Sequence, residues 1–189
     1  MPEHPIKHAA MNAEKNYFAW FDLPNRFFSD ETLLKKKFFA QSRLLHPDFH
    51  TQADEVTREE MLEKSVFNTQ AYKTLSVFDA RVKYILELET ILDEENKNTL
   101  PPDFLMDMLD FNEEIDQAKL SKNAATITLL KNRLKVLKDA FLESAKPAMN
   151  IYDEDNSKTA TLNAVRSYYL KNRYILRLED NLTDVPPNM

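Results

Sequence analysis

The sequence predicts an all-α fold, and three observations lead to that prediction. The 189-residue chain contains no glycine, so it lacks the residue that most readily supplies the positive φ angles of tight hairpin turns. Apolar residues recur at helical spacing through most of the chain, and no strand-like alternation is long enough to compete. A polar segment with two prolines, residues 93–102, predicts a linker between an N-terminal helical domain and a C-terminal three-helix bundle.

Composition excludes several classes of protein. No apolar run approaches the roughly 18 residues of a membrane span. The net charge of -6 argues against whole-surface nucleic-acid binding. Without glycine there is no P-loop, and without cysteine there is neither a disulfide nor sulfur ligation of zinc or an iron-sulfur cluster. We therefore expect no cofactor, no bound metal, no nucleic acid and no membrane partner.

The ends of the chain are expected to lie outside the folded domains. The first sixteen residues contain no arginine and no apolar core, so they fit neither a secretory signal nor a transit peptide. This predicts a flexible tail over residues 1–15 and a cytoplasmic protein. A second tail is predicted over residues 181–189.

The N-terminal domain is predicted to begin with two helices. "NYFAWFDLP" forms a short apolar entry helix that ends at Pro24. The next helix starts with Ser29 or Asp30 as its N-cap and buries Leu34, Phe38 and Leu45. Because a residue before proline is pushed out of the α region, this helix should stop near Leu45, ahead of Pro47.

Further helices are predicted by the same periodicity. They run from about Val56 to Leu75 and from Asp79 to Leu92, with Ser76 and Asp79 as cap residues between them. Beyond the linker, three segments are expected to be helical, 103–119, 123–145 and 157–180. The last two are joined by the connection "KPAMNIYDEDNS".

Two histidines four residues apart, His46 and His50, raise the alternative of a metal site. Such a pair chelates a metal when one continuous helix stacks both rings. Since Pro47 ends the helix, the two side chains should not share a face. The sequence therefore favours a structural corner over a metal site at this position.

The corner has a basic helix in front of it, and the combination resembles a J domain. The resemblance covers residues 16–78 and includes the aromatic entry helix, the basic helix, the His46-Pro47-Asp48 tripeptide and "NTQAYKTL". It implies a J domain over residues 16–92 that docks on a DnaK-type or HscA-type ATPase chaperone and stimulates its ATP hydrolysis. The implied docking residues are His46, Pro47, Asp48, Lys35, Lys36, Lys37 and Arg43. The chain itself would have no catalytic residues and would not be an enzyme.

This chain departs from the usual J-domain pattern at two places. Phe49 follows the tripeptide where a basic residue is usual, and Phe39 and Ala40 replace residues that are basic in many relatives. The affinity for the chaperone, or the choice of chaperone, is expected to differ accordingly.

The first helix after the linker is acidic and carries two apolar faces. At about 100° per residue, Phe104, Met108, Phe111 and Ile115 form a core stripe, whereas three further apolar residues fall outside it. These are Leu105, Met106 and Leu109, and the carboxylates near them are Asp110, Glu113 and Asp116. Helix geometry leaves two interpretations open: a docking surface, or a second contact face inside the bundle.

With the acidic helix included, the chain resembles the HscB family of iron-sulfur co-chaperones over residues 16–180. The signature is a J domain followed directly by a three-helix domain, here 103–180, with "FLMxxLxxxEExD". The resemblance implies that the helix binds an IscU-type cluster scaffold. The implied contact residues are Leu105, Met106, Leu109, Asp110, Glu113 and one position on the last helix, aligned with Leu170 next to Tyr168 and Tyr169.

Three alternatives stay open at this point. The chain could be a J protein that serves a different client through the same bundle. It could be a helical adaptor in which the His-Pro-Asp tripeptide is coincidental. A hydrolase or metal enzyme would need a pocket with a histidine or carboxylate cluster, and the chain has only four histidines, two of them in the N-terminal tail.

Overall fold

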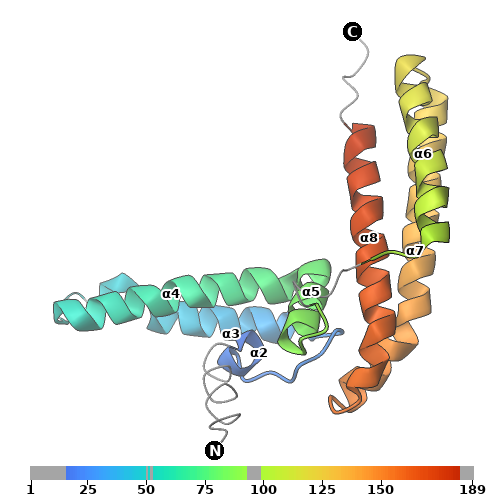
Figure 1. Cartoon of the computed structure of the whole chain (residues 1–189). Helices are drawn as coiled ribbons and strands as arrows, with labels where there is room; N and C mark the ends of the chain where they lie inside the picture. The colour runs from blue at the N-terminus through green and yellow to red at the C-terminus, as the bar shows by residue number, and fades with distance from the viewer. Residues whose placement is uncertain (1–15, 50, 52, 93–98, 184–189) are drawn as a thin grey trace, which may run out of the picture. The chain divides into compact units, whose positions relative to one another are not determined.

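The computed structural model describes residues 16–49, 51, 53–92 and 99–183. Within these ranges every regular element is helical. The chain, drawn in Figure 1, divides into two compact units between Ile85 and Leu86. Each unit has buried residues of its own. No helix in this described part of the chain combines the length and apolar character that crossing a membrane requires.

The first unit is built from short and long helices joined by tight turns. Its elements are α2 (Tyr17–Trp20), α3 (Glu31–Leu44), the 3-10 turn η1 (Pro47–Phe49), α4 (Glu55–Ser76) and most of α5 (Phe78–Leu88). Asp30 caps α3 by accepting a hydrogen bond of 2.9 Å from the Leu33 N–H. The helix ends at Leu44 with Leu45 as its C-cap, so the stop predicted ahead of Pro47 is confirmed.

Helices α3 and α4 lie side by side in Figure 1 and bury the core of this unit. Leu34 and Leu45 are buried as predicted, but Phe38 is only half-buried. Its ring stacks on Tyr72 of α4, with the ring centroids 4.2 Å apart. Apolar residues from the other elements complete the core: Phe18, Phe21, Phe27, Ala71, Leu75, Val82 and Ile85.

A buried asparagine ties three helices of this unit together. Asn68 of α4 is 1% exposed, and its Oδ1 accepts a hydrogen bond of 2.9 Å from Nε1 of Trp20 at the end of α2. Its Nδ2 donates to Oγ of Ser42 in α3, also at 2.9 Å. Because an amide can donate and accept at once, one side chain fixes the positions of α2 and α3 on α4.

The boundary between α4 and α5 is tighter than predicted. Only Val77 separates the two helices, so Asp79 lies in the first turn of α5 and does not cap it. Helix α5 ends at Leu88 and does not reach the predicted Leu92. Thr90 follows with a positive φ of 55°, a left-handed conformation that cannot continue an α-helix.

The second unit contains three long helices. They are α6 (Pro102–Leu120), α7 (Ala124–Glu154) and α8 (Leu162–Thr183), with the 3-10 turn η2 (Thr159–Thr161) before α8. In Figure 1 α6 lies along the half of α7 nearest the turn that joins them. Of the predicted tails and linker, residues 1–15, 93–98 and 184–189 lie outside the described residues. The prediction that the C-terminal tail starts at 181 is wrong, because α8 continues to Thr183 and Leu182 is buried in the core.

The prediction that residues 146–157 form a connection is wrong for residues 146–154, because α7 continues through Pro147 to Glu154, and only 155–157 lie in the connection. Proline removes one helical hydrogen bond, yet Pro147 itself is exposed while Ala148, Met149 and Tyr152 of the same segment are buried. Burial of these apolar side chains outweighs the lost bond. Helix α8 accordingly begins at Leu162 and not at 157.

The core of the second unit confirms the apolar stripe predicted for α6. Phe104, Met108, Phe111 and Ile115 are all buried. They pack with residues of the other two helices: Leu130, Leu134, Ile175, Leu178 and Leu182. Helices α7 and α8 run antiparallel, and Nζ of Lys138 lies 2.9 Å from Oε2 of Glu179 across them.

Candidate functional site

The His46-Pro47-Asp48 tripeptide forms an exposed corner at the end of α3. Pro47 and Asp48 begin the 3-10 turn η1, which closes through a hydrogen bond of 3.0 Å from the Phe49 N–H to the His46 carbonyl. The side chains of His46 and Asp48 are 55% and 83% exposed. The corner therefore presents its polar groups to solvent, as a protein-binding loop must.

The corner also fixes the orientation of the histidine ring. The Asp48 N–H donates to Nδ1 of His46 at 3.3 Å. With Nδ1 acting as acceptor, a neutral His46 carries its proton on Nε2. A protonated ring would instead pair with the Asp48 carboxylate, whose Oδ2 lies 3.5 Å from Nδ1.

The basic residues of α3 have different surroundings. Lys35, Lys36 and Arg43 are exposed. Lys37 is half-buried, and its Nζ lies 3.0 Å from Oδ2 of Asp22 and donates to the Asp22 carbonyl at 2.8 Å. Within the described residues, Lys35, Lys36 and Arg43 form no ion pair and can attract an acidic partner, whereas Lys37 is paired with Asp22.

Two phenylalanines lie among these polar groups. Phe39 is 57% exposed and stands one helical turn from both Lys35 and Arg43, which places all three on one face of α3. Phe49 is 67% exposed, with its ring edge-on to His46 at 6.4 Å between centroids. The candidate docking face is therefore apolar at the two positions where the sequence departs from the J-domain pattern.

The metal alternative depends on His50, which lies outside the described residues. The helix that would have to stack His46 and His50 ends at Leu44. Among the residues that the structure describes, no group of three histidine, cysteine or acidic side chains is arranged to hold a metal ion.

The apolar residues outside the core stripe of α6 are exposed. Leu105, Met106 and Leu109 have 41%, 69% and 58% of their surface accessible. The bundle therefore does not enclose them, and the interpretation of a second internal contact face is not supported. Large exposed apolar side chains in a contiguous group are typical of an interaction surface.

Carboxylates border this apolar strip. Asp110 and Glu113 are exposed and lie one turn from Met106 and Leu109 respectively. Neither forms an ion pair in the described part of the chain, whereas Glu114 on the α7 side is paired with Arg133. The strip thus combines an apolar centre with unpaired negative charges at its edge.

Three contacts show on which side of α6 the last helix lies. The Tyr174 ring of α8 meets Phe104 edge-on, at 5.9 Å between centroids. Asn181 of α8 bonds to Asn112 at 3.3 Å and to Lys119 at 2.6 Å. At about 100° per residue, Asn112 and Lys119 are rotated from Phe104 in the same direction as Leu105. Helix α8 therefore borders the exposed strip.

The last-helix residues suggested by alignment lie in different environments. Tyr168 and Tyr169 are buried, at 5% and 6% exposure. Leu170 is half-buried and stands one turn from Tyr174, on the α6 side of α8. Tyr174 was not predicted, because the sequence does not reveal which face of α8 meets α6. It is half-buried, and its ring contacts Phe104 of α6.

Comparisons with known proteins agree with this arrangement. Residues 100–183 match the family model of the HSCB C-terminal oligomerisation domain. The chain is 31% identical over 170 residues to a co-chaperone protein HscB homolog of Acinetobacter baylyi, covering 89% of this chain and 94% of that protein. It is 36% identical over 111 residues to the co-chaperone protein HscB of Buchnera aphidicola, where the match spans 60% of the relative's length.

A solved structure supports the fold. The chaperone HscB from Vibrio cholerae superposes with a TM-score of 0.70 at 24% identity, covering 90% of this chain and 96% of that one. The predicted fold class, a helical J domain followed by a helical bundle, is confirmed. The predicted domain bounds and contact residues stay predictions.

Proposed function

The chain belongs to the HscB family of co-chaperones, and on that basis we propose that it presents an iron-sulfur scaffold of the IscU type to a DnaK-type or HscA-type ATPase chaperone in the cytoplasm. The first unit binds the chaperone and the second binds the scaffold. The protein needs no cofactor and catalyses no reaction of its own. It favours the hydrolysis-competent state of its partner, which is a coupling between binding sites.

Docking on the chaperone is assigned to the His46-Pro47-Asp48 corner and to the cations of α3. The exposed Asp48 carboxylate can accept a charge-assisted hydrogen bond from an arginine of the partner. Exposed lysines on the preceding helix raise the encounter rate with an acidic surface. Pro47 restricts the backbone of the corner, so less conformational freedom is lost on binding.

Scaffold binding is assigned to Leu105, Met106, Leu109, Asp110 and Glu113 of α6, with Leu170 and Tyr174 of α8 beside them. The observation that carries this assignment is the 41% to 69% exposure of three large apolar side chains on a helix that already has a complete core stripe. Burying such side chains against a partner is favourable, by about 25 cal/mol per Å² of apolar area.

Calorimetric titration of the protein with the IscU-type scaffold of its own organism tests the assignment. We expect micromolar or tighter binding, and a loss of at least about tenfold in a Leu105→Ala, Leu109→Ala double variant. The matched control is Leu129→Ala with Val136→Ala, since these α7 residues are also 58% and 67% exposed but lie outside the strip. Undetectable binding by the wild type would instead indicate a J protein with another client.

Stimulated ATP hydrolysis by the chaperone tests the first unit. The wild type should accelerate hydrolysis, and His46→Gln should abolish the acceleration while the helical circular dichroism is unchanged. If the wild type has no effect on the chaperone, the J-domain function is wrong and a helical adaptor becomes the better interpretation.

A further inference from the structure

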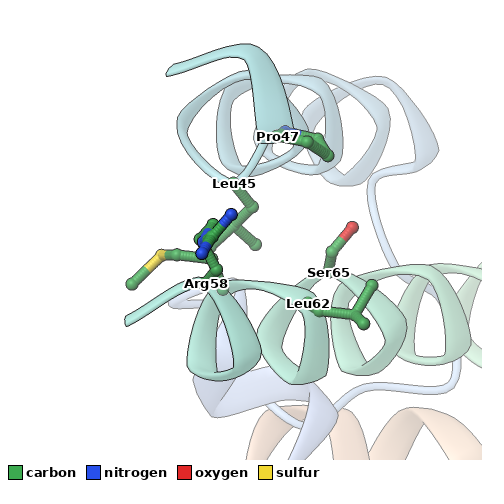
Figure 2. A pocket seen from close by; sticks show the side chains of 6 residues that line it. Leu45, Pro47, Arg58, Leu62 and Ser65 are labelled. Atoms are coloured by element: carbon green, nitrogen blue, oxygen red, sulfur yellow. The ribbon is translucent and has the colours of Figure 1, made fainter. Parts of the chain in front are cut away.

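A pocket opens between the end of α3 and the N-terminal half of α4, within the first unit. Its volume is about 220 Å³. Six residues line it: Leu45, Pro47, Arg58, Met61, Leu62 and Ser65. Figure 2 shows Pro47 on the α3 side of the opening and Leu62 and Ser65 on the α4 side, with Arg58 rising from α4 at one end.

One of the lining residues, Ser65, has a small side chain, and a larger side chain at this position would occupy part of the pocket. Ser65 and Met61 stand one turn apart on α4, and both are half-buried. Leu45 closes the pocket from the α3 side and is 7% exposed. An apolar cavity of about 150 Å³ is enough to bind benzene, so this pocket has room for a leucine, methionine or phenylalanine side chain.

The pocket is continuous with the candidate chaperone-docking corner. Pro47 belongs to the corner and also forms a wall of the pocket. A partner that contacts His46 and Asp48 therefore covers, or closely approaches, the mouth of the pocket. Leaving an apolar hole unfilled beneath such a partner would forgo favourable burial.

The charge of Arg58 indicates which kind of chaperone group lies beside the pocket. Arg58 is the one charged residue of the lining and is exposed. Its charge attracts the Asp54 carboxylate one turn earlier and helps to lower the pKa of that group, but Arg58 makes no close ion pair within the described residues. It has the same sign as Lys36 and Arg43 of the basic helix. A partner whose acidic surface contacts α3 would thus also have a cation, Arg58, available beside the pocket.

We propose that this pocket receives one apolar side chain of the ATPase chaperone, and that a carboxylate next to that side chain pairs with Arg58. The proposal rests on the proposed function, because it assumes that the corner docks on such a chaperone. It adds an apolar anchor to a site otherwise made of charges and hydrogen bonds. Anchors that fill a pocket commonly dominate the energy of an interface.

Chaperone ATPase stimulation by the full chain, measured as a function of co-chaperone concentration, tests the proposal. Leu62→Asp places a charge on the pocket wall, at a residue that is 63% exposed and so tolerates the change in the fold. Ser65→Leu places a larger apolar side chain from α4 into the pocket. Each should raise the concentration for half-maximal stimulation by about tenfold or more, the order expected for one lost buried side chain.

The matched control is Val66→Asp, which is 60% exposed on the same helix but does not line the pocket. It should change the half-maximal concentration by less than about twofold. For the charge, Arg58→Glu should weaken stimulation, whereas Lys73→Glu in the last turn of α4 should not. Circular dichroism establishes that each variant is folded.

The possible outcomes separate the two hypotheses. If the wild type stimulates the chaperone and His46→Gln does not, but Leu62→Asp and Ser65→Leu behave as the wild type, the pocket proposal is overturned and the proposed function stands. If the wild type fails to stimulate at all, both are overturned. If the pocket variants alter self-association in sedimentation but not stimulation, the occupant is a second copy of this chain and the proposal is equally wrong.

Discussion

The Tyr174 ring of α8 packs edge-on against the Phe104 ring of α6, with 5.9 Å between their centroids. Phe104 begins the buried stripe of α6, and the next residue, Leu105, begins the exposed strip. Tyr174 therefore stands at the boundary between the core of the second unit and its candidate scaffold surface. A tyrosine in this position can pack its ring in the core and also contact the scaffold, because it has an apolar ring and a polar hydroxyl.

Replacing Tyr174 should weaken scaffold binding without unfolding the bundle. We expect Tyr174→Ala to lower the affinity for the IscU-type scaffold by about fivefold or more, since interface tyrosines are frequent anchors. Isothermal calorimetry measures the change. Tyr174→Phe is the conservative control and should retain most of the affinity. Unchanged binding by Tyr174→Ala would restrict the site to α6.

The lysines of α3 should differ in their effect on chaperone association. Lys36 is exposed, whereas Lys37 is held by Asp22 at 3.0 Å. Lys36→Glu should therefore reduce the association rate by about threefold or more at low salt, and the reduction should fade as salt screens the charge. Lys37→Glu, which makes the same change of charge, should change the rate less. Stopped-flow kinetics at several ionic strengths measures both association rates. If the Lys36 and Lys37 variants slowed association equally, the contact between Lys37 and Asp22 would not matter for docking.

The N-cap of α4 should make stability depend on pH. Asp54 accepts a hydrogen bond of 2.7 Å from the Thr57 N–H. This bond, with the Thr57 hydroxyl and Arg58, holds the pKa of Asp54 below its ordinary value. Because the folded pKa is depressed, the stabilisation is complete above the ordinary value of about 3.9 and is lost as pH falls through the folded pKa.

A thermal melt of Asp54→Ala tests this expectation. The variant should melt below the wild type at neutral pH, since the Thr57 N–H loses its acceptor. The difference should shrink in acid, below the folded pKa. Asp54→Asn keeps an acceptor and should melt nearer the wild type at neutral pH. A difference that persists unchanged in strong acid would contradict the assigned cause.

A buried asparagine in α8 should cost stability. Asn172 is 2% exposed, and its Oδ1 has no hydrogen-bond partner within the described residues. Leucine has a similar branched shape and no polar atoms. We expect Asn172→Leu to raise the free energy of unfolding by about 1 to 2 kcal/mol, as measured in urea. A loss of stability would indicate that the amide has a partner in solution, such as a water molecule.

The sequence was most informative where a periodic pattern met a single local signal. The core stripe of α6 follows from spacing alone, and the end of α3 follows from Pro47. Pro147 carries the same signal as Pro47, yet α7 continues past it. The difference lies in the long-range packing of Ala148, Met149 and Tyr152, which a local rule does not include.

The candidate sites were predictable to a similar extent. Exposure of Leu105 and Leu109 is one of two outcomes that helix geometry allows, and only the neighbouring helices decide between them. Tyr174 and the pocket beside Pro47 depend on how two helices pack. The restraint of Lys37 depends on Asp22, which adopts a positive φ of 47° in a chain without glycine. These features arise from tertiary contacts that no motif encodes.

Trp20, whose indole N–H donates to Asn68, is a fluorescent probe located in the first unit. Trp20 is the only tryptophan in the chain. Its emission spectrum therefore records the state of the J domain alone, while far-ultraviolet ellipticity records the helices of both units. In a denaturant titration, coincident transitions in the two signals would mean that the units unfold as one cooperative system. Separated transitions would assign a midpoint to each unit in the intact protein.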